Sequence, residues 1–302
     1  MARPDSLTVA SAQYPIGEPT SLFEWQDKIA QWVADGAATG ADLLVFPEYA
    51  AMEQAACFGR EVARDLGASM RAVAEQAGAR VAFHVELAAQ HDVHILVGSG
   101  PVLAADGRFL NAAQLVTPGG LVGEQTKLIM TPFERAWGIS PGGPARAFDT
   151  ALGRIAIAIC YDSEFPLNVR AMAAAGAELI VVPSCTERLS GYHRVRTGAR
   201  ARALENQIAC VTSPTVGNAP WSPAVDINTG AAGIFVPSES GVSDTGVLAE
   251  GALNEPGWVT ASIDLSGLRK LRDGGEMRNF VDWMQQTGAS DLAHAVEIVG
   301  LE

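Results

Sequence analysis

The chain has 302 residues, of which 48% are apolar, and this is enough to bury roughly three quarters of the unfolded surface in a large core. Its 34 acidic residues outnumber its 21 basic ones, which argues against nucleic acid or an anionic membrane as a partner, because phosphates attract a basic face. No signal-like or membrane-spanning apolar run occurs, and the four cysteines form no Cys-x-x-Cys pair and are too few for a disulfide scaffold. We therefore expect a soluble protein of the reducing cytoplasm.

Strand-like and helix-like segments alternate along the sequence, which predicts an α/β fold in which helices cover sheets. In chain order we expect a strand at 7–13, a helix at 25–37, a strand within 41–50, helix over 60–90, a strand at 93–100, two strands within 109–123, strands at 153–162 and 177–184, a helix near 191–206, and strands at 208–214 and 257–265. The Gly-, Ser- and Pro-rich region 215–256 is expected to hold loops and short strands. No linker or repeat interrupts this pattern, so we predict a single domain over 1–302, regular over about 7–265, with a C-terminal extension at 266–302.

Two of the expected strands end in residues that can carry chemistry, as strands of α/β folds often do. Glu48 follows the apolar run LLVFP, where partial burial would raise its pKa toward that of a useful base, although a surface loop glutamate is the plainer interpretation. Cys160 ends the run GRIAIAIC and is followed by YDSEFP. A thiol at such a polar turn is a candidate nucleophile, whereas Cys185 and Cys210 fit ordinary buried strand positions better.

A third candidate, Lys127, lies in GEQTKLIMTPFER between an apolar strand and a turn that contains proline. A lysine beside a thiol can stabilise an oxyanion, and Glu134, seven residues later, could hold it in place. Each of these residues is a weak signal alone, and they gain weight as a set.

The segments FPEYA (46–50), KLIMTPFER (127–135) and CYDSEFP (160–166), in that order, resemble the nitrilase or carbon–nitrogen hydrolase superfamily. Further support comes from PSCT (183–186), followed by GYHRVRTGARARALENQ (191–207). The resemblance covers roughly residues 7–265. Three separated motifs at family spacing are far more specific than a single short pattern.

The resemblance implies a four-layer α-β-β-α sandwich with a Glu-Lys-Cys triad. Glu48 falls on the general base, Lys127 on the lysine, Cys160 on the nucleophile and Glu134 on the second glutamate that many members carry. It also implies a homodimer or larger homo-oligomer, and the mechanism needs neither a metal nor an organic cofactor.

On this basis we expect a hydrolase that cleaves a non-peptide C–N bond of a small amide through a cysteine thioester. The oxyanion would be bound by the Lys127 ammonium and the backbone N–H of Tyr161. Thr186 and Glu187 are expected to line the pocket. The sequence Cys160-Tyr161-Asp162 favours amides, since members that act on nitriles usually show Cys-Trp-Glu; hydrolysis of a nitrile or an N-carbamoyl compound is the alternative.

Three other interpretations compete with this one. The string Gly138-Ile139-Ser140-Pro141-Gly142 matches G-x-S-x-G, but the Gly143-Pro144 that follows cannot begin the helix behind a nucleophile elbow. His91 and His94 have the spacing of metal ligands but no evident third ligand nearby. A non-catalytic binding protein on the same fold is the remaining alternative, against which stands the presence of all three triad residue types.

Overall fold

The computed structural model describes residues 3–286, 288–289 and 296–301. Its strands are β1 (Ser6–Pro15), β2 (Leu43–Val45), β3 (His94–Leu103), β4 (Phe109–Val116), β5 (Val122–Thr126), β6 (Ala145–Thr150), β7 (Gly153–Ile157), β8 (Leu179–Ser184), β9 (Ala209–Asn218), β10 (Ile227–Asn228), β11 (Gly233–Phe235), β12 (Val247–Glu250), β13 (Gly257–Asp264) and β14 (Val296–Gly300).

The α-helices are α1 (Leu22–Ala37), α2 (Arg60–Arg64), α3 (Leu66–Glu75), α4 (Ala77–His91), α5 (Pro132–Ala136), α6 (Pro166–Ala174), α7 (Leu189–Asn206), α8 (Leu265–Gly274) and α9 (Asn279–Asp282). Three 3₁₀ helices join them, η1 (Ala50–Phe58), η2 (Cys160–Glu164) and η3 (Trp283–Gln285). Among the described residues, no helix is both long and apolar enough to cross a bilayer.

The strands form two sheets that are joined into one 14-stranded sheet at the end of β1. The first has the order β13-β1-β2-β3-β4-β5, and the second runs β14-β6-β7-β8-β9 and continues into β11 and β12. They are joined where Tyr14 and Pro15 of β1 pair in parallel with Thr215 and Val216 of β9. The C-terminal segment belongs to this framework, because β14 pairs in parallel with β6.

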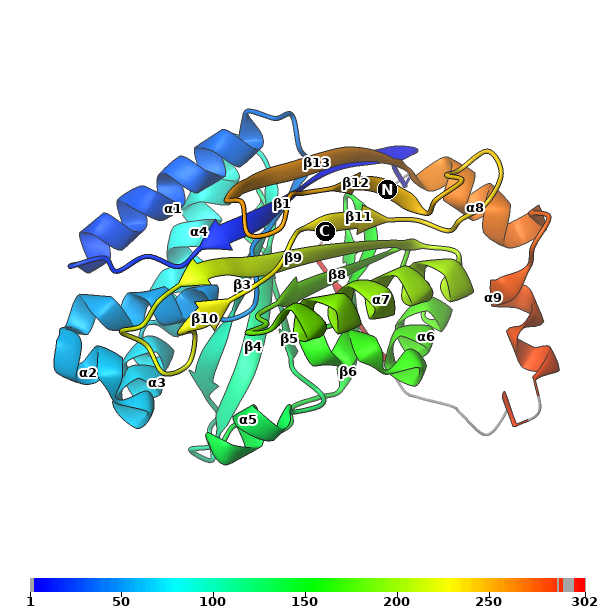
Figure 1. Ribbon diagram of the computed structural model, residues 1–302. Coiled ribbons are helices and arrows are strands. Elements are labelled where there is room, and N and C mark those ends of the chain that lie inside the picture. The colour runs from blue at the N-terminus through cyan, green and yellow to red at the C-terminus, as the bar shows by residue number, and fades with distance from the viewer. Residues whose placement is uncertain (1–2, 287, 290–295, 302) are drawn as a thin grey trace.

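The sheets stack face to face with helices on both outer sides, which is the four-layer arrangement that the family resemblance implied (Figure 1). Successive residues of β1 show the division, since Val9 belongs to the core between the sheets whereas Ala10 packs with α1 and its neighbours. This follows from the two-residue period of a strand. Helices α6 and α7 cover the second sheet through buried residues such as Val169 and Ala199.

The structure differs from the sequence prediction at several places. The strand expected at 153–162 ends at Ile157, and Cys160 opens η2 instead. The helical region 60–90 is divided into α2, α3 and α4, and β6 was not expected as a strand. Between Ile157 and Cys160 the chain leaves the sheet, and Cys160 lines a cavity.

Candidate active site

Glu48, Lys127 and Cys160 come from three distant parts of the sequence and lie around one cavity. Glu48 follows β2 after Phe46 and Pro47, Lys127 directly follows β5, and Cys160 begins η2 after β7. All three line a cavity of about 730 Å³. The folded chain thus brings together the three residues that the strand-end pattern singled out.

The Lys127 ammonium bridges two buried carboxylates. Its Nζ lies 2.7 Å from Glu48 Oε1 and 2.7 Å from Glu134 Oε2, and all three side chains are at most 2% exposed. Burial alone would lower the pKa of Lys127, but the two carboxylates outweigh it and raise the pKa above its ordinary value. The lysine is therefore a permanent cation. Because an ammonium has three donors, one N–H remains for a group in the cavity.

The Glu48 carboxylate has one oxygen that is more heavily used than the other. Oε1 accepts from Lys127 Nζ and from Asn111 Nδ2, the latter at 3.0 Å. Oε2 accepts from the backbone N–H of Cys185 at 3.0 Å. Burial raises the pKa of Glu48, assisted by Glu134 and opposed by Lys127. Since Oε2 keeps a free lone pair, it is the oxygen suited to accept a proton.

Cys160 has a left-handed backbone conformation, and its side chain is buried. Its φ is 47°, in the left-handed region that non-glycine residues rarely adopt. The Sγ atom lies 3.9 Å from the carbonyl oxygen of Cys185. Burial and the nearby Glu48 raise the pKa of the thiol well above its ordinary value, despite Lys127. The resting group is thus a neutral thiol, which needs a base to become a nucleophile.

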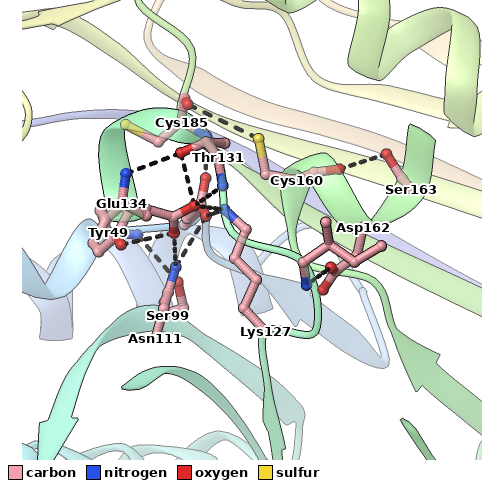
Figure 2. A network of polar contacts seen from close by, with 12 residues as sticks. Tyr49, Ser99, Asn111, Lys127, Thr131, Glu134, Cys160, Asp162, Ser163 and Cys185 are labelled. Atoms are coloured by element: carbon pink, nitrogen blue, oxygen red, sulfur yellow. Dashed lines mark hydrogen bonds and ion pairs between the residues drawn. The ribbon is translucent and has the colours of Figure 1, made fainter. Parts of the chain in front are cut away.

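Glu134 is fixed from several directions at the start of α5. It forms a capping box with Thr131, whose Oγ1 accepts the Glu134 N–H and whose own N–H donates to Glu134 Oε2. Its Oε1 accepts from Tyr49 Oη at 2.9 Å and from Asn111 Nδ2 at 3.1 Å (Figure 2). Burial raises the pKa of Glu134, but Lys127 and the donors of Thr131 and Asn111 outweigh it and lower the pKa overall. An ionised Glu134 therefore holds the lysine in place.

The other predicted pocket residues also line the cavity, but in different ways. Tyr161 packs its ring edge-on against Phe165, with ring centroids 4.8 Å apart. Thr186 is buried, and its Oγ1 donates to the carbonyl oxygen of Thr229 at 2.6 Å. Glu187 is exposed and lies 3.8 Å from Arg188. The Thr186 hydroxyl is thus used in a hydrogen bond within the fold, whereas Glu187 lies at the exposed mouth of the cavity.

Three residues that sequence reasoning missed complete the site. Asn111 donates to both Glu48 and Glu134 and is fully buried. The signal for it in the sequence is an amide side chain within the largely apolar segment FLNAAQLV of β4. Tyr49 follows Glu48 with a φ of 55°. Cys185 was expected to be a plain core residue, and this was wrong, because its backbone contacts both Glu48 and Cys160 and the residue lines the cavity. Such contacts depend on tertiary structure.

The competing motifs do not form sites. The string 138–142 lies in the loop between α5 and β6, where Ser140 donates its backbone N–H to Phe109, so the strand–turn–helix of a nucleophile elbow is not there. His91 ends α4 and His94 begins β3. Within the described ranges, no group of three or more His, Cys, Asp or Glu side chains is arranged to hold a metal ion.

Comparison with known proteins identifies the family of this chain. The carbon–nitrogen hydrolase family matches residues 8–273. A probable hydrolase of Bacillus subtilis, YhcX, is 37% identical over 277 residues, which are 91% of this chain and 53% of that protein. An (R)-stereoselective amidase of a Pseudomonas species is 35% identical over 185 residues, 60% of this chain and 61% of that protein. The chain therefore spans about half to three fifths of the length of these relatives.

Solved structures show the same fold. Saccharomyces cerevisiae Nit3, of the nitrilase superfamily, superposes with a TM-score of 0.71 at 20% identity, covering 89% of this chain and 94% of that one. An amidase from Nesterenkonia sp. gives a TM-score of 0.68 at 22% identity, covering 93% of this chain and 96% of that one. From the family match across most of its length and this shared architecture, we conclude that the chain belongs to the carbon–nitrogen hydrolase family.

Proposed function

We propose that this protein hydrolyses a non-peptide C–N bond of a small amide through a thioester on Cys160. The observation that carries the proposal is the Lys127 ammonium, held between Glu48 and Glu134 in the cavity that Cys160 also lines. A base, a fixed cation and a nucleophile would thus surround one space. A relative that is an (R)-stereoselective amidase is 35% identical to this chain, against 29–30% for the nitrilases among the relatives, and this supports an amide rather than a nitrile as the substrate.

In the first half of the reaction, Glu48 Oε2 takes the thiol proton while Cys160 Sγ attacks the amide carbon. The carbonyl oxygen becomes an oxyanion, which the third N–H of Lys127 and the backbone N–H of Tyr161 would bind. Glu48 then gives its proton to the amide nitrogen, the C–N bond breaks, and ammonia or an amine leaves. Cys160 is left as a thioester.

In the second half, Glu48 removes a proton from water, which attacks the thioester carbon. The C–S bond breaks, the thiolate regains the proton through Glu48, and a carboxylic acid is released. The sum is amide plus water giving acid plus ammonia or amine. The raised pKa of Glu48 suits it to both giving and taking a proton.

An ammonia-release screen tests this function. Aliphatic amides, ω-amides, N-carbamoyl amino acids and nitriles would be offered to the native protein and to Cys160→Ala, with thermal unfolding to check the fold. We expect release from at least one amide, none from the variant, and an acyl adduct on Cys160 by mass spectrometry after acid quench. Turnover by the variant, or activity confined to nitriles or carbamoyl compounds, would contradict the proposal.

Assembly into a homodimer or larger homo-oligomer remains a prediction. Light scattering after size-exclusion chromatography measures it directly, and a mass equal to one chain at micromolar concentration would count against it.

A further inference from the structure

Asp162 joins the turn that carries the nucleophile to the segment that carries the lysine. It lies two residues after Cys160 in η2, and its side chain is fully buried. Its Oδ2 accepts the backbone N–H of Leu128 at 3.1 Å and its Oδ1 that of Ile129 at 2.8 Å. These are the two residues that follow Lys127, and Figure 2 shows Asp162 beside the backbone at the base of the lysine side chain.

The backbone of Lys127 is held on its other side by β4. Its N–H donates to the carbonyl oxygen of Asn111 at 2.8 Å, and its own carbonyl accepts from Gly142 at 2.9 Å. In the part of the chain that the structure describes, Asp162 makes both of the side-chain hydrogen bonds between η2 and residues 127–131. This carboxylate therefore links the turn that begins at Cys160 to the segment that follows Lys127.

We infer that Asp162 is a positioning residue, which sets the distance between Cys160 Sγ and the Lys127 ammonium. The inference rests on the proposed function. During the reaction the oxyanion forms on the carbon bonded to Sγ, so its distance from Lys127 Nζ is fixed by how the two segments sit. Asp162 does not line the cavity and so acts through these two residues rather than on the substrate.

The environment of Asp162 disfavours a charge, so the two hydrogen bonds of its carboxylate matter for its placement. Burial raises its pKa to about 7, with Lys127 lowering and Glu48 raising it. An ionised carboxylate in such a place is unfavourable by itself. The two backbone N–H groups offset part of this cost, because each carboxylate oxygen accepts one of them.

Asp162→Asn is the sharpest test, because asparagine keeps the shape but has only one acceptor oxygen and turns an N–H₂ toward a backbone donor. We expect kcat for the best amide to fall at least about tenfold, with KM changed less than about threefold, since the lost contact acts on the transition state. Asp149→Asn is the matched control. Asp149 lies in β6 and pairs with Arg154, and this variant should keep kcat within about twofold of the native value.

A double-mutant cycle separates positioning from a general structural effect. If Asp162 acts through Lys127, adding Asp162→Asn to Lys127→Met should change kcat by less than about threefold, because the lysine that it positions is gone. If the fold-changes in kcat of the two single variants multiply in the double variant, the inference is overturned. Native kcat in Asp162→Asn would also overturn it.

Two further results keep the test decisive. If Asp162→Asn does not fold, Asp162→Ser, which keeps one acceptor in a smaller side chain, takes its place in the same cycle. Absence of turnover by the native protein on every amide would instead contradict the proposed function, and is thus distinct from failure of the inference.

Discussion

The Lys127 ammonium lies 2.7 Å from Glu48 Oε1, and both side chains are almost completely buried although 79 residues separate them. A buried ion pair gains little net stability, because desolvation of the two charges offsets their attraction. Here a third charge, Glu134, leaves the group with one net negative charge inside the protein. Such an arrangement is expected for a site that moves a proton.

Replacing Lys127 should affect both rate and stability. In Lys127→Ala the oxyanion loses a donor, so we expect kcat to fall by about 10²–10³. The two carboxylates would also be left buried without a cation, which destabilises by about 3–5 kcal/mol. Steady-state kinetics and chemical denaturation measure the two effects, and near-native kcat would remove Lys127 from the mechanism.

Glu134→Gln tests whether the second glutamate acts by holding the lysine. Glutamine keeps the shape and one acceptor oxygen but removes the charge that opposes Lys127. We expect kcat to fall about 10- to 100-fold, with a smaller change in KM, because Lys127 would be less firmly aimed at the oxyanion. A change in KM alone would indicate instead that Glu134 contacts the substrate.

Alkylation by iodoacetamide at neutral pH should distinguish Cys160 from the other cysteines. Burial raises the pKa of all four thiols, so none of them has a ready thiolate. We expect Cys160 to differ because Glu48 acts as its base in an accessible cavity. Peptide mapping should find Cys160 labelled fastest. Glu48→Gln should abolish this preference, and equal slow labelling of all four cysteines would contradict the assignment of the nucleophile.

Activity and one part of the stability should change with pH in opposite directions. Glu48 must be ionised to act as a base, so kcat/KM should fall as the pH drops through its raised pKa, above the ordinary value of 4.5. Asp162 has a folded-state pKa of about 7 against an ordinary 3.8, so its contribution to stability is fully present below about 4 and is lost as the pH rises through 7.

Thermal unfolding between pH 4 and 8 measures that contribution. The difference in Tm between the native protein and Asp162→Asn should shift in favour of the variant as the pH rises, because asparagine carries no charge to bury. A difference that is independent of pH would show that Asp162 does not titrate in this range.

The charges around the cavity should select against acidic substrates. Its lining has five carboxylates against three cations, namely Glu48, Glu134, Glu164, Glu187 and Asp226 against Lys127, Arg188 and Arg194. Arg194 pairs with Glu164 at 3.3 Å and Arg188 with Glu187 at 3.8 Å, while Asp226 is exposed and has no ion pair within the described residues. An anionic acyl group would thus meet repulsion at the mouth.

We expect kcat/KM for succinamate to be about tenfold lower than for pentanamide, a neutral amide of similar length, and the gap to shrink in high salt. Asp226→Asn should reduce this difference in kcat/KM between the two substrates by a few-fold. Glu276→Gln, which removes an exposed charge outside the cavity lining, is the matched control and should leave it unchanged. A preference for succinamate would overturn this expectation.

Local signals in the sequence were enough to predict the layered α/β architecture and the three chemical residue types. Strands can be predicted because their side chains alternate between faces. Glu48 and Cys160 are polar or reactive residues at the ends of apolar runs, and Lys127 gained weight only together with them. The order of the motifs identified the family. Strand periodicity and family motifs each lie within a few neighbouring residues, so they can be recognised without knowledge of the folded chain.

The groups that hold the triad could be found only in the folded chain. Asn111, Tyr49 and Cys185 reach Glu48 or Glu134 across separations of 23 to 137 residues, and Cys185 does so through its backbone, which no side-chain pattern reveals. The Asp162 carboxylate likewise accepts hydrogen bonds from two backbone N–H groups 33 and 34 residues away. Such bonds form because sheet packing brings strand ends together in space, and the pairing of distant strands is set by the whole core rather than by any one segment.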